Sequence, residues 1–228
     1  MKVKWSGIGV TDGRNKIGGS VASRNTFGAY FRNKVTPVNP QTPAQSAVRA
    51  VFADISQGWR DLTEAERDAW NQAVPNFIFT DIFGDSLDPT GFNLHQQLNL
   101  NLSAIDLPFI TTPPAPADVQ SLTNLALAEA GGGTVLEVES TDAIEAGTDF
   151  IIKATAGLSA GVSFVKTELK AIQIADDGDS FPIDITTGYE AVFGALPPTG
   201  SKAFVEMIGV NDTTGQRGAG IKAFVIIA

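Results

Sequence analysis

The sequence predicts an α+β protein of several domains, in which a β-rich arm and a small helical module precede an antiparallel β-sandwich. Three observations lead to this prediction. Residues 1–36 are rich in glycine and alternate apolar with polar side chains, residues 37–112 carry helix-start signals, and residues 118–228 contain short β-rich runs. Residues 113–117 include three prolines, which neither a helix nor a central strand accommodates, so we expect a linker there.

The arm is expected to form short strands and turns with little core of its own. Alternation is visible in Val3-Lys4-Trp5 and around Ile8 and Val10, and residues 26–32 are a further strand candidate. Short strands with few apolar anchors are marginally stable alone. We therefore expect the arm to pack against another element or another subunit.

The first helix is expected to begin at Pro43. Thr42 is placed to cap it, proline is tolerated in the first turn because its missing N–H has no partner there, and Gln45 completes a capping-box pattern. We expect Gly58 to end or interrupt this helix. One apolar stripe at three-and-four spacing follows the helix: Ala44, Ala47, Val48, Val51, Phe52, Ile55 and Trp59.

Two more helices follow in the module. Thr63 and Glu66 form a second capping-box pattern, and Pro75 is expected to close that helix. Thr90 is expected to cap a third helix that runs to Ile105. Residues 98–102 also alternate as a strand would, but the apolar i, i+4 spacing persists over three turns, which favours the helix.

The carboxy-terminal half changes to short β-rich runs separated by glycine, aspartate and proline. Seven short strands with no helical pattern between them favour an antiparallel sandwich. The seven runs cover residues 122–127, 134–139, 150–154, 169–174, 181–186, 203–210 and 221–227.

Charge is unevenly distributed along the chain. Residues 1–36 carry a net charge of +6, residues 37–110 of −6 and residues 111–228 of −9. The total of −9 argues against a nucleic-acid or anionic-membrane binder held by its overall field, although a local basic patch remains open. Opposite zones attract each other, within one chain or between neighbouring copies, so the basic arm is a candidate docking element.

Few residues are suited to catalysis. The chain has no cysteine and one histidine, His95, which excludes thiol chemistry and histidine-rich metal sites. Asp176-Asp177-Gly178-Asp179 lacks the spacing of a calcium loop, so an acidic turn is the preferred interpretation over a calcium site. Gly7-Ile8-Gly9 and Gly131-Gly132-Gly133 match no phosphate loop. We expect no enzymatic activity, no cofactor and no metal.

The arm interleaves basic with aromatic residues. This pattern allows stacking on single-stranded nucleic acid, but the acidic total favours docking on an acidic protein surface. The residues expected at this assembly interface are Trp5, Arg14, Lys16, Arg24, Phe27, Tyr30, Arg32 and Lys34.

Three motifs of the arm and helical module resemble a group of virion-associated proteins from tailed phages and prophages. Residues 39–45 read NPQTPAQ, and residues 58–71 contain the pattern W-x-x-L-T-x-x-x-R-x-x-W. Residues 90–102 place Gly-Phe-Asn at the start of the expected third helix. The match covers roughly residues 14–105. The motifs supply helix caps and tryptophans that pack the helices against each other, so they indicate an architecture more than an activity.

The sandwich resembles a fibronectin type III or related immunoglobulin-like domain. The likeness lies in residues 196–205, which read LPPTGSKAFV, and in Val210-Asn211. These residues resemble the approach to the penultimate strand of such a domain, the strand itself and the turn after it.

Together the resemblances imply a structural component of a phage particle, in the capsid or its decoration, the neck or the tail. The start of the sequence has no apolar stretch typical of a signal peptide, and no 18-residue apolar run occurs, so we expect assembly in the bacterial cytoplasm and no membrane partner. The partners would be other phage structural proteins and further copies of the chain. Two alternatives remain: recognition of a glycan or host surface by the sandwich loops, and nucleic-acid binding by the arm.

Overall fold

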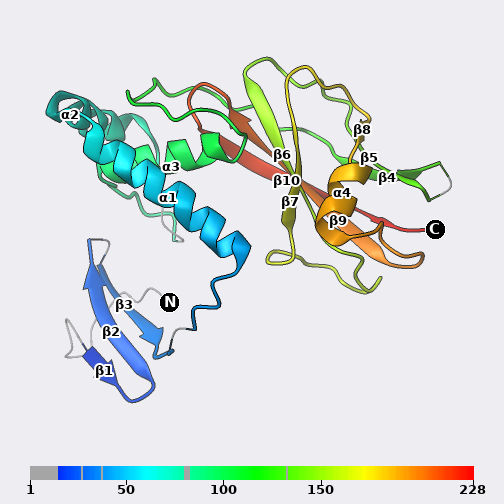
Figure 1. The fold of residues 1–228 in the computed structure, drawn as a ribbon, viewed down its shortest axis with the longest axis horizontal. Helices are drawn as coiled ribbons and strands as arrows, with labels where there is room; N and C mark the ends of the chain where they lie inside the picture. The colour runs from blue at the N-terminus through cyan, green and yellow to red at the C-terminus, as the bar shows by residue number, and fades with distance from the viewer. Residues whose placement is uncertain (1–14, 27, 37, 80–82, 132) are drawn as a thin grey trace. The chain divides into compact units, whose positions relative to one another are not determined.

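The computed structural model describes residues 15–26, 28–36, 38–79, 83–131 and 133–228. The described residues form an α+β fold, as predicted, with four α-helices and three antiparallel sheets (Figure 1). Two compact units divide the chain: residues 1–48 with 78–87, and residues 49–77 with 88–228. These boundaries differ from the expected ones, because most of the helical module belongs to the same unit as the sandwich.

The first unit contains a three-stranded antiparallel sheet in the order β1-β2-β3. Its strands are β1 (Asn15–Ile17), β2 (Ser20–Asn25) and β3 (Gly28–Asn33). The strand expected over residues 26–32 starts two residues late, since Thr26 lies in the turn that joins β2 to β3. The alternation around Trp5, Ile8 and Val10 lies outside the described residues. Among the described residues of this unit, Ala22 is the one buried hydrophobic side chain, which fits the expectation of little core.

The helices begin where the sequence predicted. They are α1 (Pro43–Asp61), α2 (Glu64–Ala73) and α3 (Gly91–Ser103), and a 3₁₀ turn at Val74–Asn76 holds Pro75. The Thr63 hydroxyl accepts from the Glu66 N–H, and the Glu66 carboxylate accepts from the Thr63 N–H at 2.7 Å, which completes the capping box. The expectation that Gly58 ends α1 is wrong. The helix continues to Asp61, because Trp59 packs its ring against Phe92 and His95 of α3.

The pairing of α2 with α3 depends on a close approach at Gly91. A Cβ atom there would lie 2.6 Å from the backbone nitrogen of Asn71, so only glycine fits without a shift of one helix. The Gly91 N–H donates to the Asn71 side chain at 3.0 Å. Fully buried Trp70 fills the adjacent core and donates its indole N–H to the Thr111 carbonyl at 2.8 Å.

Each of the seven predicted β runs overlaps a strand of the second unit. The first begins four residues later than expected, and the fifth is reduced to two residues. The strands are β4 (Ala126–Ala130), β5 (Val135–Glu139), β6 (Thr148–Ala154), β7 (Lys170–Ala175), β8 (Ile183–Asp184), β9 (Lys202–Asn211) and β10 (Arg217–Ile226).

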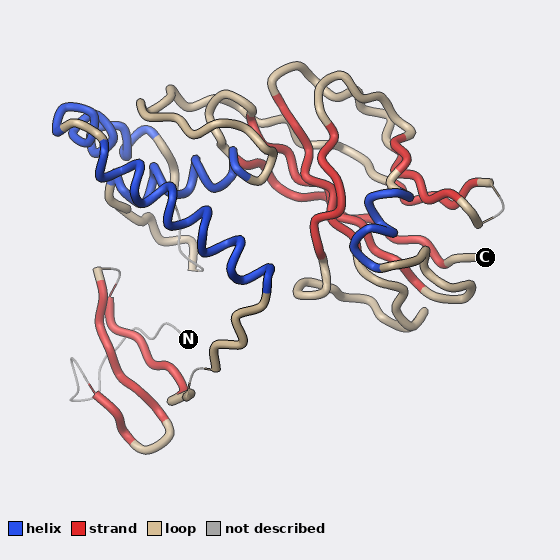
Figure 2. Tube along the Cα trace, in the orientation of Figure 1, coloured by secondary structure: helices blue, strands red, loops and turns tan. Residues whose placement is uncertain are grey.

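The strands form two antiparallel sheets that share one hydrophobic core (Figure 2). The larger has the order β10-β9-β6-β7 and the smaller the order β4-β5-β8. Side chains that alternate along each strand meet between the sheets, as a sandwich requires. The most deeply buried of them include Leu127, Leu136, Val138, Phe150, Ile152, Val205 and Met207.

A fourth helix, α4 (Thr186–Phe193), corrects the expectation that no helix lies among the strands. It contacts β7, and its Tyr189 ring belongs to the sandwich core with 1% of its surface exposed. The Tyr189 hydroxyl donates to the Thr155 carbonyl at 2.8 Å, and burial raises the pKa of Tyr189 to about 12. Burial of Tyr189 thus stabilises a helix that has no side-chain cap at its start.

Helix α3 covers part of the outer face of the larger sheet. Leu102 and Ile105 form a second hydrophobic cluster with Ile151 of β6 and Val210 of β9. As a result residues 207–210 of β9, next to α3, are buried on both faces of the sheet. The helices and the sandwich of this unit are therefore joined by apolar packing.

Candidate assembly surfaces

The structure describes five of the eight residues expected at the assembly interface. Lys16 lies in β1, Arg24 in β2, Tyr30 and Arg32 in β3, and Lys34 directly follows β3. The other three, Trp5, Arg14 and Phe27, lie outside the described residues.

Strand register places Lys16, Tyr30 and Arg32 on one face of the sheet. Val21 of β2 pairs with both Lys16 and Arg32, so these three side chains form one row across the sheet. Tyr30 lies two residues from Arg32 and therefore on the same face. Arg24 pairs with Ala29 and points to the opposite face. One face of the sheet thus presents two cations and one aromatic ring.

The first half of α1 is the second candidate surface. Residues 43–53 contain one charged side chain, Arg49, and otherwise consist mainly of apolar residues. Most of this segment is exposed: Val48 keeps 67% and Phe52 48% of its surface, whereas Ile55 in the second half keeps 1%. A helix that is apolar around most of its circumference is normally buried. The predicted stripe therefore exists, but the described residues cover only its carboxy-terminal part.

Further apolar side chains of the first unit are exposed. Val35 and Val38 precede α1 with 73% and 86% of their surfaces exposed, and Ile78 keeps 94%. Single exposed apolar residues are common on proteins, but several in one short unit indicate an interaction surface.

His95, the one histidine of the chain, is part of the helical core. Its side chain is 3% exposed and lies edge-to-face between Trp59 and Trp70, with centroid distances of 5.3 and 5.1 Å. Burial lowers the pKa of His95 below its usual value, and its Nδ1 finds no hydrogen-bond partner among the described residues. This closed position suits a packing role in the helical core.

The Asp176–Asp179 segment forms an acidic turn, which is the interpretation that the sequence favoured over a calcium site. The Gly178 N–H donates to the Asp176 carboxylate at 2.9 Å, and the Asp176 N–H donates to the Asp179 carboxylate at 3.2 Å. Over the ranges that the structure describes, no three acidic or histidine side chains are grouped so that they could hold a metal ion.

A shallow hollow of about 300 Å³ lies beside β4 and β5, lined in part by Phe181, Glu139 and Thr141. Its best-placed amide, Asn124, already donates to the Thr141 hydroxyl and accepts from the Thr141 N–H and the Ser140 hydroxyl. The polar atoms that would select a sugar are thus bonded to each other, so the hollow gives the glycan alternative little support.

No family model, curated protein or solved structure matches the chain. In the described part of the chain, no helix is both long and apolar enough to cross a membrane.

Proposed function

We propose that this chain is a structural component of a tailed-phage particle and acts by packing against neighbouring protein subunits, without a catalytic step. The exposed apolar half of α1 is the observation that carries this proposal. Water-exposed apolar surface lowers stability and solubility, and a neighbouring subunit that covers it removes both costs.

The sheet of the first unit supports the same proposal. It has one buried hydrophobic side chain among its described residues and one face that carries Lys16, Tyr30 and Arg32. Such a sheet gains stability when it adds to, or lies on, a neighbouring acidic subunit. The helical module would orient the chain, and a sandwich of the fibronectin type III or related kind would project from the assembly.

The resemblance of three motifs to virion-associated phage proteins supplies the biological setting of the proposal. These motifs include the exposed Thr63 cap of α2 and the Trp59 and Trp70 rings, which pack on either side of His95. They orient α1 on α2 and α3 and so determine which side of α1 faces outward.

Sedimentation velocity in 500 mM NaCl tests the proposal, because salt at this concentration screens ionic contacts and preserves apolar ones. We expect the wild-type chain to associate as its concentration rises and Phe52→Glu to weaken this association at least tenfold. Val192→Glu, which places the same charge on another exposed apolar position, serves as the matched control and should associate as wild type. A wild-type chain that stays monomeric, or an unaffected Phe52→Glu variant, would refute this role of α1.

A further inference from the structure

Alternating residues of three strands form a lysine–phenylalanine face on the outer side of the larger sheet. Strand register pairs Lys202 with Ile226, Phe204 with Phe224, and Glu206 with both Lys222 and Lys153. The intervening residues, such as Ala203, Val205 and Met207, belong to the core. The face consists of Lys153, Lys202, Phe204, Glu206, Lys222, Phe224 and Ile226. Lys202 and Phe204 are buried beneath it, so the side chains that it presents to solvent are chiefly Lys153, Lys222, Phe224 and Ile226.

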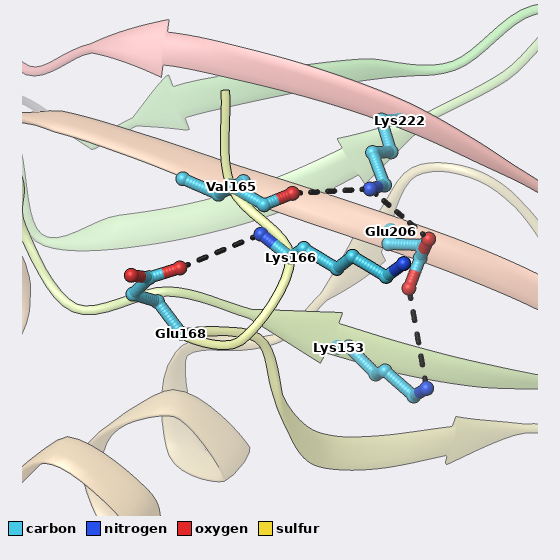
Figure 3. Close-up of polar contacts among 6 residues, drawn as sticks. All are labelled: Lys153, Val165, Lys166, Glu168, Glu206 and Lys222. Carbon is cyan, nitrogen blue, oxygen red and sulfur yellow. Dashed lines mark hydrogen bonds and ion pairs between the residues drawn. The ribbon is translucent and has the colours of Figure 1, made fainter. Parts of the chain in front are cut away.

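Positive charge exceeds negative charge on this face. Glu206 lies between Lys222, at 3.5 Å, and Lys153, at 4.0 Å, and a single carboxylate cannot neutralise both (Figure 3). Lys166, in the loop over the sheet, points its side chain toward the same carboxylate in Figure 3. Burial lowers the pKa of Lys153, repulsion by Arg217 and Lys222 lowers it further, and the Glu206 carboxylate raises it.

Exposed aromatic and aliphatic side chains adjoin these lysines. Phe224 keeps 55% and Ile226 52% of its surface exposed, and Phe164 of the covering loop keeps 75%. The Lys202 ammonium lies 3.8 Å from the centre of the Phe224 ring and donates to the Val162 carbonyl at 2.9 Å. Phe224 is thus held in place, and a fixed aromatic ring beside cations is typical of a protein interface.

The opposite end of the same sheet carries four aspartates and one cation, Arg217, which shares the row of Asp149 because both pair with Val210. Asp149 is the second residue of β6, four residues or about 13 Å before Lys153 along an extended strand. Asp176 and Asp177 directly follow β7, and Asp212 follows β9. Burial, and then repulsion by these three carboxylates, raises the pKa of Asp149. We call these four residues the aspartate end.

We propose that the lysine–phenylalanine face of one copy binds the aspartate end of a second copy. The argument is charge complementarity, since one sheet carries both surfaces at opposite ends. Because the two surfaces differ, the contact is head-to-tail and repeats into a ring or a filament. This inference deepens the proposed function by naming the partner and the polarity of one contact.

A second copy fits this face better than a nucleic acid does. Residues 111–228 carry a net charge of −9, which repels a long polyanion, whereas a second copy places only its aspartate end against the lysines. The exposed Phe224 and Ile226 side chains also favour a partner whose surface contributes apolar side chains.

Charge-reversal substitutions on the two surfaces test this contact. They are made in a chain that already carries Phe52→Glu, so that association through α1 does not contribute. In this background, at 50 mM NaCl, we expect residual association that is lost at 500 mM. Adding Lys166→Glu with Lys222→Glu, or Asp177→Lys with Asp212→Lys, should weaken it at least tenfold. An equimolar mixture of the two charge-reversed proteins should restore it, because each supplies a surface complementary to the other. Asp118→Lys with Glu190→Lys controls for net charge and should not weaken association.

Several outcomes would overturn the inference. They are no salt-sensitive association in the Phe52→Glu background, no recovery on mixing, and an equal loss in the Asp118→Lys, Glu190→Lys control. Binding of a single-stranded oligonucleotide that Lys166→Glu with Lys222→Glu abolishes, while self-association is unchanged, would assign the face to nucleic acid instead. None of these results alters the 500 mM NaCl test of α1, so the two proposals can fail separately. Circular dichroism melts verify that each variant is folded.

Discussion

The Asn101 side chain of α3 donates a hydrogen bond to the carbonyl of Gly215, in the turn between β9 and β10, at 2.8 Å. This bond joins residues 114 positions apart. Beside it, the Leu98 carbonyl and the Leu102 side chain of α3 press on Gly215 so closely that no Cβ atom fits. A hydrogen bond and close packing therefore join α3 to the sandwich at this turn.

Gly215→Ala should be strongly destabilising. Gly215 has a φ of +71°, and an added Cβ would clash with the Leu98 carbonyl oxygen. The left-handed conformation alone costs about 1–2 kcal/mol for alanine, and the clash raises the expected loss to about 3 kcal/mol. Urea unfolding measures it. Gly200→Ala is the matched control, since Gly200 has a φ of +78° with nothing within 4 Å, and should lose only about 1 kcal/mol. Equal losses would mean that α3 does not press on this turn.

His95 should make the fold less stable in mild acid. Because burial lowers its pKa in the folded state, the unfolded chain binds a proton more readily. Stability should therefore be constant above about pH 7 and fall as pH decreases through 6.5, by at most about 1.4 kcal/mol per pH unit.

A non-titrating variant checks the assignment to His95. His95→Gln should be less stable than wild type at pH 8 but should show a much smaller decline down to about pH 5. Because His95 is the one histidine of the chain, NMR of its ring protons also gives the folded-state pKa directly. A folded-state pKa at or above 6.5 would contradict the burial argument.

Asp149→Asn should stabilise the fold at neutral pH. Burial and the nearby carboxylates raise the pKa of Asp149, so the folded state disfavours its charged form. The protonated group is favourable at low pH, and this advantage is lost as pH rises through the raised pKa. We expect a gain of a few tenths to about 1 kcal/mol at pH 7 and little change near pH 3, measured by urea unfolding. The exposed Asp118→Asn should change stability at neither pH; a matching gain there would indicate a general charge effect.

Local sequence signals predicted most of the elements. The Thr63 capping box and the Thr90 cap are short-range interactions within four residues, so the sequence displays them directly. The strand runs are likewise visible as apolar residues between turn residues. Helix α4 has no such signal: it contains Gly188, lacks a side-chain cap and is stabilised by Tyr189 in a core that forms only when both sheets meet.

The surfaces were harder to predict because they depend on register and on coverage. Lys16 and Arg32 share a face with each other, but not with Arg24, only because of how β1, β2 and β3 pair. The stripe on α1 was visible in the sequence, but which half stays exposed depends on tertiary packing, since α3 contacts the second half of α1 at Trp59. The lysine–phenylalanine face was missed, although the alternation Lys202-Phe204-Glu206 was a usable signal, because its rows need the pairing of β9 with β6 and β10.

Hydroxyl-radical footprinting of Phe52 tests the central claim most directly. The experiment compares dilute with concentrated protein in 500 mM NaCl and uses Phe109, which is 43% exposed, as an internal reference. If neighbouring subunits cover the first half of α1, labelling of Phe52 falls severalfold on association while labelling of Phe109 is unchanged. If the chain associates and Phe52 is labelled as strongly as before, α1 is not the assembly surface.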